Sequence, residues 1–228
     1  MDVSLPLPKG HPRCSALSLP VKHYGKPDVL DHCSTKRSIE FGELAFQKAV
    51  TPADKGWAQR GLALAWCRAG EPNKGIELLS TTLTTFRAGH FTPSVIPTTC
   101  TLGEGYWLAG EDDKARQMLE EALEIADRCG ARYYVGFTHR LLGEIVLKTN
   151  PGQAAAYFEK SIAIFREIKA ENEFALAYAG YGRLHKQQGK VGQAREYLTK
   201  ALEIFERLGT LLEPDKVREE LADLPKER

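Results

Sequence analysis

The sequence predicts an all-α protein, an alpha-alpha superhelix (solenoid) of about four helical hairpins with a C-terminal capping helix. One amphipathic segment recurs at an interval of about 40 residues, with a small residue at its centre: Ala63, Gly103, Gly143 and Gly182. Each copy is followed by a second amphipathic segment with its own small residue: Gly75, Ala115, Ala154 and Ala194. A turn-forming sequence such as Asn150-Pro151-Gly152 separates the two segments. The small residues favour close crossings, because only Gly or Ala lets two helix backbones approach each other.

The elements are expected in the following order. Residues 1–37 are rich in proline and lack periodicity, which predicts an irregular arm. The repeat domain is expected over 38–228, beginning with a short helix over Ser38 to Val50 that would be the second half of a degraded hairpin. The four hairpins are expected over 53–91, 92–130, 131–170 and 171–209, with the capping helix over 214–224.

The second hairpin contains two prolines near its start, Pro93 and Pro97. Proline lacks a backbone donor and fits best in the first turn of a helix. The regular helix is therefore expected to start only near Pro97, which makes this the most irregular point of the predicted array.

The amino-acid composition argues against some classes of function. Lys plus Arg number 31 against 30 Asp plus Glu, which argues against binding to nucleic acid or membrane surfaces by bulk charge. The five cysteines form no C-x-x-C pair, which is typical of a reducing compartment. The sequence has no apolar run long enough to cross a membrane and no apolar signal-peptide core. We therefore expect a cytoplasmic protein.

Motifs of enzyme chemistry are not found. The glycines Gly103 and Gly105 lack a third member and a preceding strand, and no phosphate-binding loop, H-E-x-x-H or G-x-S-x-G motif occurs. Pairs such as His11 with Cys14 have no second pair at metal-ligand spacing. His139 and His185 fall at bulky packing positions and are expected to be packed and hydrogen-bonded. The sequence predicts no enzyme activity, no cofactor and no metal site.

The small residues at the centres of the first segments belong to a longer sequence pattern. Leu102-Gly103 is followed by Tyr106 and then Ala115, and Gly182 is followed by Ala194 at the same spacing. This pattern resembles the tetratricopeptide repeat over roughly 53–209, with an interval longer than the usual 34 residues. The longer form, with the closing text ALEIFERLGTLLEPDKVREELADLP, is similar to C-terminal tetratricopeptide regions of large bacterial signalling proteins that carry an ATPase or nucleotide-cyclase portion.

The resemblance implies that the first helix of each hairpin lines a concave groove that binds a short peptide. Nine side chains are expected to face this groove: Arg60, Arg68, Glu104, Trp107, Arg140, Glu144, Lys148, Arg183 and Lys186. Basic residues outnumber acidic ones, which favours a partner with carboxylates, and ordinary solvated charges are the alternative interpretation. Arg60, Arg140 and Arg183 occupy equivalent positions of their repeats to within one helical turn. They are expected to form a ladder along one wall of the groove.

Two functional classes follow from this resemblance. The first is a non-enzymatic protein or peptide interaction module, a regulatory or scaffold part of a signalling protein. The second is a ligand- or peptide-sensing regulator that transmits changes of superhelix curvature to an ATPase, cyclase or transcription partner.

Overall fold

The computed structural model describes residues 27–210 and 213–225, and within these ranges the chain forms ten helices and no strand. The helices are α1 (Pro27–Lys48), α2 (Pro52–Arg68), α3 (Pro72–Ala88), α4 (Thr92–Leu108), α5 (Asp112–Arg128), α6 (Arg132–Val146), α7 (Pro151–Glu167), α8 (Glu171–Gln187), α9 (Val191–Leu208) and α10 (Glu213–Ala222). The predicted all-α superhelix of four hairpins with a capping helix is confirmed.

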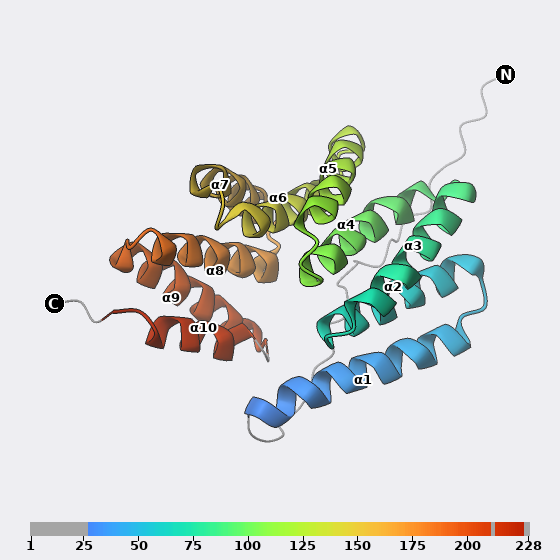
Figure 1. Ribbon diagram of the computed structural model, residues 1–228, viewed down its shortest axis with the longest axis horizontal. Helices are drawn as coiled ribbons and strands as arrows, with labels where there is room; N and C mark the ends of the chain where they lie inside the picture. Colours follow the sequence, from blue (N-terminus) through green and yellow to red (C-terminus); the bar gives the residue numbers. More distant parts are fainter. Residues whose placement is uncertain (1–26, 211–212, 226–228) are drawn as a thin grey trace.

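The hairpins are α2 with α3, α4 with α5, α6 with α7, and α8 with α9, and each packs on the next. The first helices of successive hairpins also contact one another, so that α2, α4, α6 and α8 lie side by side. Figure 1 shows the resulting arch, with α1 at one end and α10, packed on α9, at the other. The array thus presents one continuous face made of first helices.

Helix ends are set by local sequence. Proline begins α2, α3 and α7, where the missing N–H costs no hydrogen bond. Past the ends of α2 and α8, Gly70 and Gly189 take φ values of 85° and 72°, a left-handed conformation that glycine adopts without a Cβ clash. These short turns hold the two helices of each hairpin against each other.

The helix crossings explain the small residues in the repeat. A Cβ added to Gly103 of α4 would lie 2.7 Å from Cγ of Leu119 on α5. A Cβ added to Gly182 of α8 would likewise lie 2.8 Å from Cγ of Leu198 on α9. Side chains at these positions would force the paired helices apart.

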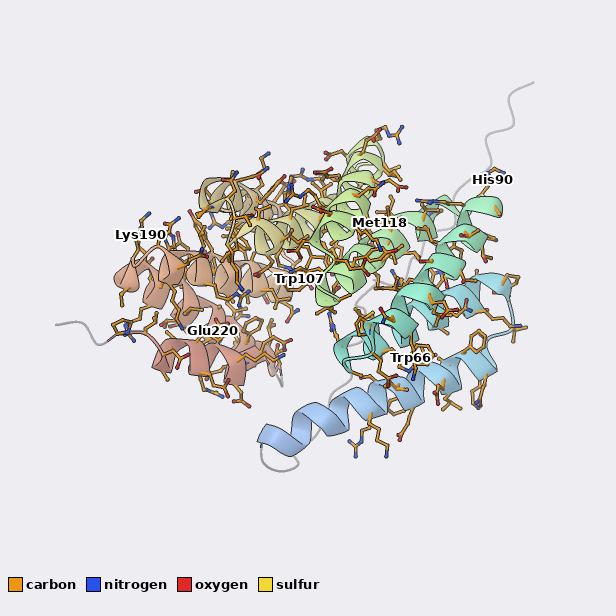
Figure 2. All side chains as sticks on the ribbon, in the orientation of Figure 1. Trp66, His90, Trp107, Met118, Lys190 and Glu220 are labelled. Atoms are coloured by element: carbon orange, nitrogen blue, oxygen red, sulfur yellow. The ribbon has the colours of Figure 1, made fainter. Side chains whose placement is uncertain are left out.

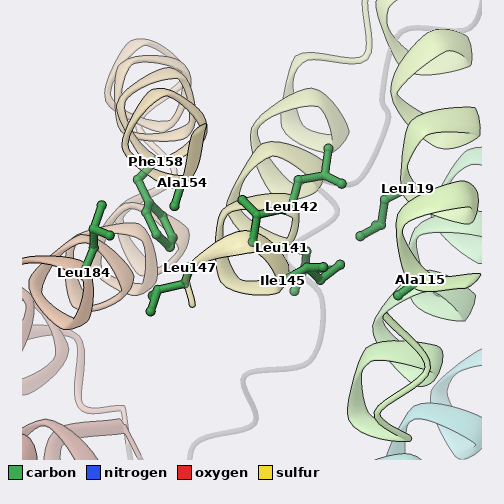
Figure 3. Close-up of a cluster of buried hydrophobic side chains, with 10 residues drawn as sticks. Ala115, Leu119, Leu141, Leu142, Ile145, Leu147, Ala154, Phe158 and Leu184 are labelled. Atoms are coloured by element: carbon green, nitrogen blue, oxygen red, sulfur yellow. The ribbon is translucent and has the colours of Figure 1, made fainter. Parts of the chain in front are cut away.

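The core is distributed between neighbouring hairpins, as stacking of repeats requires. Figure 3 shows its largest cluster, in which Leu141, Leu142 and Ile145 of α6 lie between Leu119 of α5 and Phe158 of α7. Ala115, Ala154 and Leu184 belong to the same cluster. Each hairpin therefore depends on both neighbours for burial.

Two expected helix starts were wrong. Helix α1 begins at Pro27 rather than Ser38, so it crosses the expected end of the arm, and residues 1–26 lie outside the described residues. From Lys36 onward this helix is mostly exposed and contacts α2 along a narrow stripe, where a Cβ on Gly42 would lie 2.9 Å from Cβ of Leu62. A helix that buries so little side-chain surface shows no long apolar periodicity in its sequence.

The second wrong start concerns α4, which begins at Thr92 and includes Pro97 in its interior. Pro97 is buried, and α4 contacts α2, α3, α5 and α6. The buried threonine hydroxyls near it are satisfied within the helix, because Thr98 Oγ1 donates to the Ser94 carbonyl at 2.7 Å and Thr101 Oγ1 donates to the Pro97 carbonyl at 2.8 Å. Tertiary packing thus overrides the low helix propensity of this segment.

Candidate partner-binding face

The candidate site is the surface formed by α2, α4, α6 and α8, which we call the inner face. Eight of the nine groove residues expected from the sequence lie on these helices, and Lys148 follows the end of α6. In Figure 2, Trp107 of α4 lies on the inner side of the arch. The role of these residues in binding a partner stays a prediction, and the structure defines their contacts within the chain.

On the inner face, the pair of Arg68 and Glu104 joins the first two hairpins. Nη2 of Arg68, in the last turn of α2, donates to Oε1 of Glu104 on α4 at 2.7 Å. The Glu104 side chain is 7% exposed, whereas that of Arg68 is 57% exposed. The neighbouring carboxylate raises the pKa of the Arg68 guanidinium. The pair therefore compensates a nearly buried carboxylate at the boundary between two hairpins.

A second pair joins the third and fourth hairpins. Nε of Arg140 on α6 lies 3.6 Å from Oε2 of Glu173 on α8, and both side chains are nearly buried. The Arg140 guanidinium also lies over the ring of Phe137, with Cζ 5.1 Å from the ring centroid. Burial, with a smaller contribution from Glu173, raises the pKa of the adjacent Tyr133 phenol. Arg140 is thus held by its own chain on two sides.

Arg183 on α8 bridges two carboxylates. Its Nη2 contacts Oε1 of Glu144 on α6, and its Nη1 donates to Oε1 of Glu220 on α10 at 3.1 Å. Nearby, Nζ of Lys186 lies 3.6 Å from Oδ2 of Asp223. The capping helix and the residue after it therefore supply carboxylates at the position that a further first helix would occupy.

These contacts correct the expected ladder of three arginines. Arg140 and Arg183 already have carboxylate partners, so they are not free to receive the carboxylates of a ligand. Arg60 differs, because its guanidinium lies over the ring of Trp57, 5.9 Å from the centroid, and makes no ion pair with any described residue. Three of the nine predicted residues have no ion pair among the described residues: Arg60, Trp107 and Lys148.

The sequence did not reveal the surface around Trp57. The side chain of Trp57 is 52% exposed, although large aromatic residues are highly buried on average. Its Nε1 donates to Oγ of Ser94 on α4 at 3.1 Å, which fixes the ring at the edge of the inner face. A hollow of about 350 Å³ adjoins the ring and is lined by Ala45, Lys48, Ala49, Val50, Asp54, Trp57 and Ala58.

The two histidines are packed, as expected. His139 lies beside Tyr157 with ring centroids 5.7 Å apart, and His185 stacks on Tyr197 at 5.4 Å. Burial lowers the pKa of both imidazoles. The expected hydrogen bond is not seen at Nδ1 of either ring among the described residues.

The described ranges contain no group of three or more His, Cys, Asp and Glu residues that could hold a metal ion. None of the helices in these ranges is long and apolar enough to cross a membrane.

Fold and surface together define a solenoid of helical hairpins, a class whose stacked repeats present extended interaction surfaces. A family model described as a tetratricopeptide repeat matches residues 54–128 and 98–167, and a second model of the same description matches 175–207. These matches cover more than half of the chain. The protein belongs to the tetratricopeptide repeat family and has the fold of a protein-interaction or regulatory module.

One curated relative is the regulatory protein AfsR of Streptomyces griseus, which is 33% identical over 103 residues. The match covers 45% of this chain and only 11% of AfsR.

Solved structures share the fold at low sequence identity. Aspartyl phosphate phosphatase F of Bacillus subtilis has a TM-score of 0.66 at 12% identity, over 82% of this chain and 53% of that one. BtubC of P. vanneervenii has a TM-score of 0.56 at 19% identity, over 87% and 94% of the two chains. A kinesin light chain-like repeat protein of Podospora anserina has a TM-score of 0.52 at 16% identity, over 83% and 100%.

Proposed function

We propose that this chain is a non-enzymatic interaction module whose inner face receives a segment of a partner protein or peptide, as the regulatory or scaffold part of a signalling protein. The observation that carries the proposal is the continuous inner face, on which first helices of all four hairpins contact one another. A surface of this kind can contact an extended or helical segment over several hairpins.

The chemistry of this face favours a partner with carboxylates. Arg60 and Lys148 make no ion pair within the described residues, and Trp107 is only partly buried. Guanidinium and ammonium groups bind carboxylates, and tryptophan contributes apolar contact area at interfaces. The paired residues Arg68, Glu104, Arg140, Glu144, Arg183 and Lys186 shape the same face and remain part of the proposed site.

The similarity to AfsR, a regulatory protein, supports a regulatory role. A cytoplasmic setting, without nucleic-acid or membrane partners, is part of the proposal. The free thiols of Cys67, Cys100 and Cys129 support it, since a reducing compartment preserves free thiols.

A second candidate is a sensor that passes a change of superhelix curvature to an ATPase, cyclase or transcription partner. The observation that favours it is the set of ion pairs between successive first helices, such as Arg68 with Glu104 and Glu144 with Arg183. A ligand that competed for one of these charges would loosen one junction of the arch and change its curvature.

The test is capture of partners on the purified full chain, followed by cross-linking mass spectrometry and affinity measurement. We expect cross-links on α2, α4, α6 and α8. Reversal of Arg60 and Lys148 to Glu should weaken binding at least tenfold, whereas reversal of Lys160 and Lys200, exposed on α7 and α9, should change it less than twofold. Equal losses from both double variants would contradict a specific inner face.

A further inference from the structure

We infer that the N-terminal end of the inner face, centred on Trp57 and Arg60, is the docking point for a short acidic peptide that carries an apolar anchor side chain. This inference rests on the proposed function and specifies where and by what chemistry the partner is held.

The first step is the distribution of available charge. Towards the C-terminal end of the inner face, Arg140, Arg183 and Lys186 each lie within 4 Å of a carboxylate of the same chain, at distances up to 3.6 Å. At Arg140 and Arg183, a ligand carboxylate would have to displace Glu173 or Glu144, whose side chains are 15% and 8% exposed, and leave it unpaired, which is unfavourable. Arg60, at the opposite end of this face, and Lys48, at the C-terminal end of the neighbouring helix α1, form no ion pair with any described residue. Like Lys148, they can accept a carboxylate without such a loss.

The second step is the fixed geometry of the aromatic ring. Trp57 is 52% exposed, yet its Nε1 is held by the Ser94 hydroxyl at 3.1 Å. The guanidinium of Arg60 lies 5.9 Å from the ring centroid, so the two side chains are positioned together before any ligand arrives. Little side-chain entropy is lost on binding to such a pair, and tryptophan and arginine are the residues that most often dominate binding energy.

The third step is the hollow beside Trp57. Its walls are formed largely by Ala45, Ala49 and Val50, and Val50 is 85% exposed. The hollow is shallow and open to solvent, and its volume of about 350 Å³ has room for one or two apolar side chains. The hollow therefore offers an anchor position next to the unpaired cations.

The hollow and the adjoining Arg60 together carry one net positive charge. The hollow is lined by Lys48 and Asp54, and the Asp54 carboxylate accepts hydrogen bonds from Oγ1 and N of Thr51 at 2.7 and 3.2 Å. These bonds lower the pKa of Asp54, so its carboxylate stays ionised and offsets one of the two cations. The remaining positive charge favours an anionic ligand.

The charge also argues against the chain's own N-terminal segment as occupant. Residues 1–26 contain Lys9, Arg13, Lys22 and Lys26 against Asp2 alone. Such a segment would bring like charges to Lys48 and Arg60. An acidic segment of another protein is the occupant that the charges favour.

The experiment selects binders from a random 12-residue peptide library on the full-length chain and measures their affinities by fluorescence anisotropy at two salt concentrations. The selected peptides should be enriched in Asp and Glu together with one aromatic or aliphatic residue. Trp57→Ala and Arg60→Glu should each weaken binding at least tenfold, and Arg60→Gln should do so with a smaller salt dependence.

Matched controls are Leu208→Ala and Arg128→Glu, at exposed sites on α9 and α5, which should change affinity less than twofold. Circular dichroism and thermal melting verify that each variant folds.

Several outcomes would overturn the inference. Selected peptides without acidic residues, or no binding peptide at all, would exclude an acidic ligand. Loss of binding in Trp107→Ala and Lys148→Glu, but not in Trp57→Ala, would move the site elsewhere on the inner face and leave the proposed function intact. Competition by a synthetic peptide of residues 1–26 would make the chain's own segment the occupant. A dimer that Trp57→Ala dissociates, seen by light scattering, would make it a second copy.

Discussion

Nη2 of Arg68 on α2 donates to Oε1 of Glu104 on α4 across 2.7 Å, although the two residues are 36 positions apart in the sequence. Arg183 has the same relationship with Glu144 and with Glu220, at separations of 39 and 37 residues. Each separation is close to one repeat, so these pairs connect equivalent regions of successive first helices. The charged residues of the inner face therefore act between hairpins as well as towards solvent.

The ion pair of Arg68 and Glu104 predicts that substitution of its two members destabilises the fold to different extents. Arg68→Ala leaves the Glu104 carboxylate, 7% exposed, without its cation. We expect a loss of about 1–3 kcal/mol in the free energy of unfolding, below the value for a fully buried pair because Arg68 is half exposed. Glu104→Gln should cost less, since the exposed guanidinium of Arg68 stays solvated. Urea denaturation of both variants measures the difference.

The control for this prediction is Arg128→Ala, which removes an exposed pair with Glu124 on α5. Its effect should stay within about 0.5 kcal/mol. If Glu104→Gln proved more destabilising than Arg68→Ala, the buried carboxylate would not be the group that needs compensation.

The helix crossings predict that replacing two glycines by alanine changes the free energy of unfolding in opposite directions. Gly182→Ala should destabilise by about 1–3 kcal/mol, because its Cβ would lie 2.8 Å from Cγ of Leu198. Gly61→Ala on α2 should stabilise by up to about 1 kcal/mol, because no atom lies within 4 Å of the added Cβ and alanine is the better helix former. Thermal or urea unfolding of both variants measures the two changes in stability. Equal effects at the two glycines would mean that Gly182 does not lie at a crossing.

Much of the fold could be predicted because its determinants are local or repeated. Small residues such as Gly103 and Gly182 occupy the crossings, and the turn sequences place nearly every helix boundary within a few residues. The start of α1 was missed because an exposed helix has no buried stripe to reveal it. The start of α4 was missed because tertiary packing accommodates Pro97 inside a helix.

The site was less predictable than the fold. Sequence position identified residues that lie on the first helices, but it could not tell which charges would be neutralised. The partners of Arg140 and Arg183 come from the next hairpin or the cap, and their approach depends on the rotation between repeats. The exposure of Trp57 also depends on where α1 ends relative to α2, which no repeat pattern specifies.

Burial of the two histidines predicts a dependence of stability on pH. Burial, assisted by Lys160 for His139 and by Lys190 for His185, lowers both pKa values below the ordinary value of 6.5. The unfolded chain then binds more protons than the folded one below that value, so stability should be complete above pH 6.5 and fall as the pH decreases through it. The slope cannot exceed about 1.4 kcal/mol per pH unit for each histidine.

The measurement for this prediction compares urea denaturation at pH 7.5 and 5.5 for the parent and for the double variant His139→Gln and His185→Gln. The double variant should show a shallower decrease between the two pH values, whatever its absolute stability. An unchanged slope would assign the acid sensitivity to other groups, such as the carboxylates in ion pairs.

Arg183 predicts that the capping helix is coupled to the third hairpin. Arg183→Gln leaves two carboxylates without their cation, those of Glu144 and Glu220, whose side chains are 8% and 26% exposed. We expect a loss of about 1–3 kcal/mol in the free energy of unfolding, reduced from the fully buried case by solvent access to Glu220. Because α10 is terminal, it should lose protection from hydrogen exchange first.

A double-mutant cycle tests this coupling. Adding Glu144→Gln to Arg183→Gln removes the uncompensated charge, so the double variant should be more stable than the sum of the single effects predicts, by about 1 kcal/mol or more. Lys200→Gln, which breaks an exposed pair with Glu196, should change stability by less than about 0.5 kcal/mol. If Arg183→Gln behaved like Lys200→Gln, and hydrogen exchange in α10 stayed at the parent rate, the bridge from α6 through α8 to α10 would make no energetic contribution to the array.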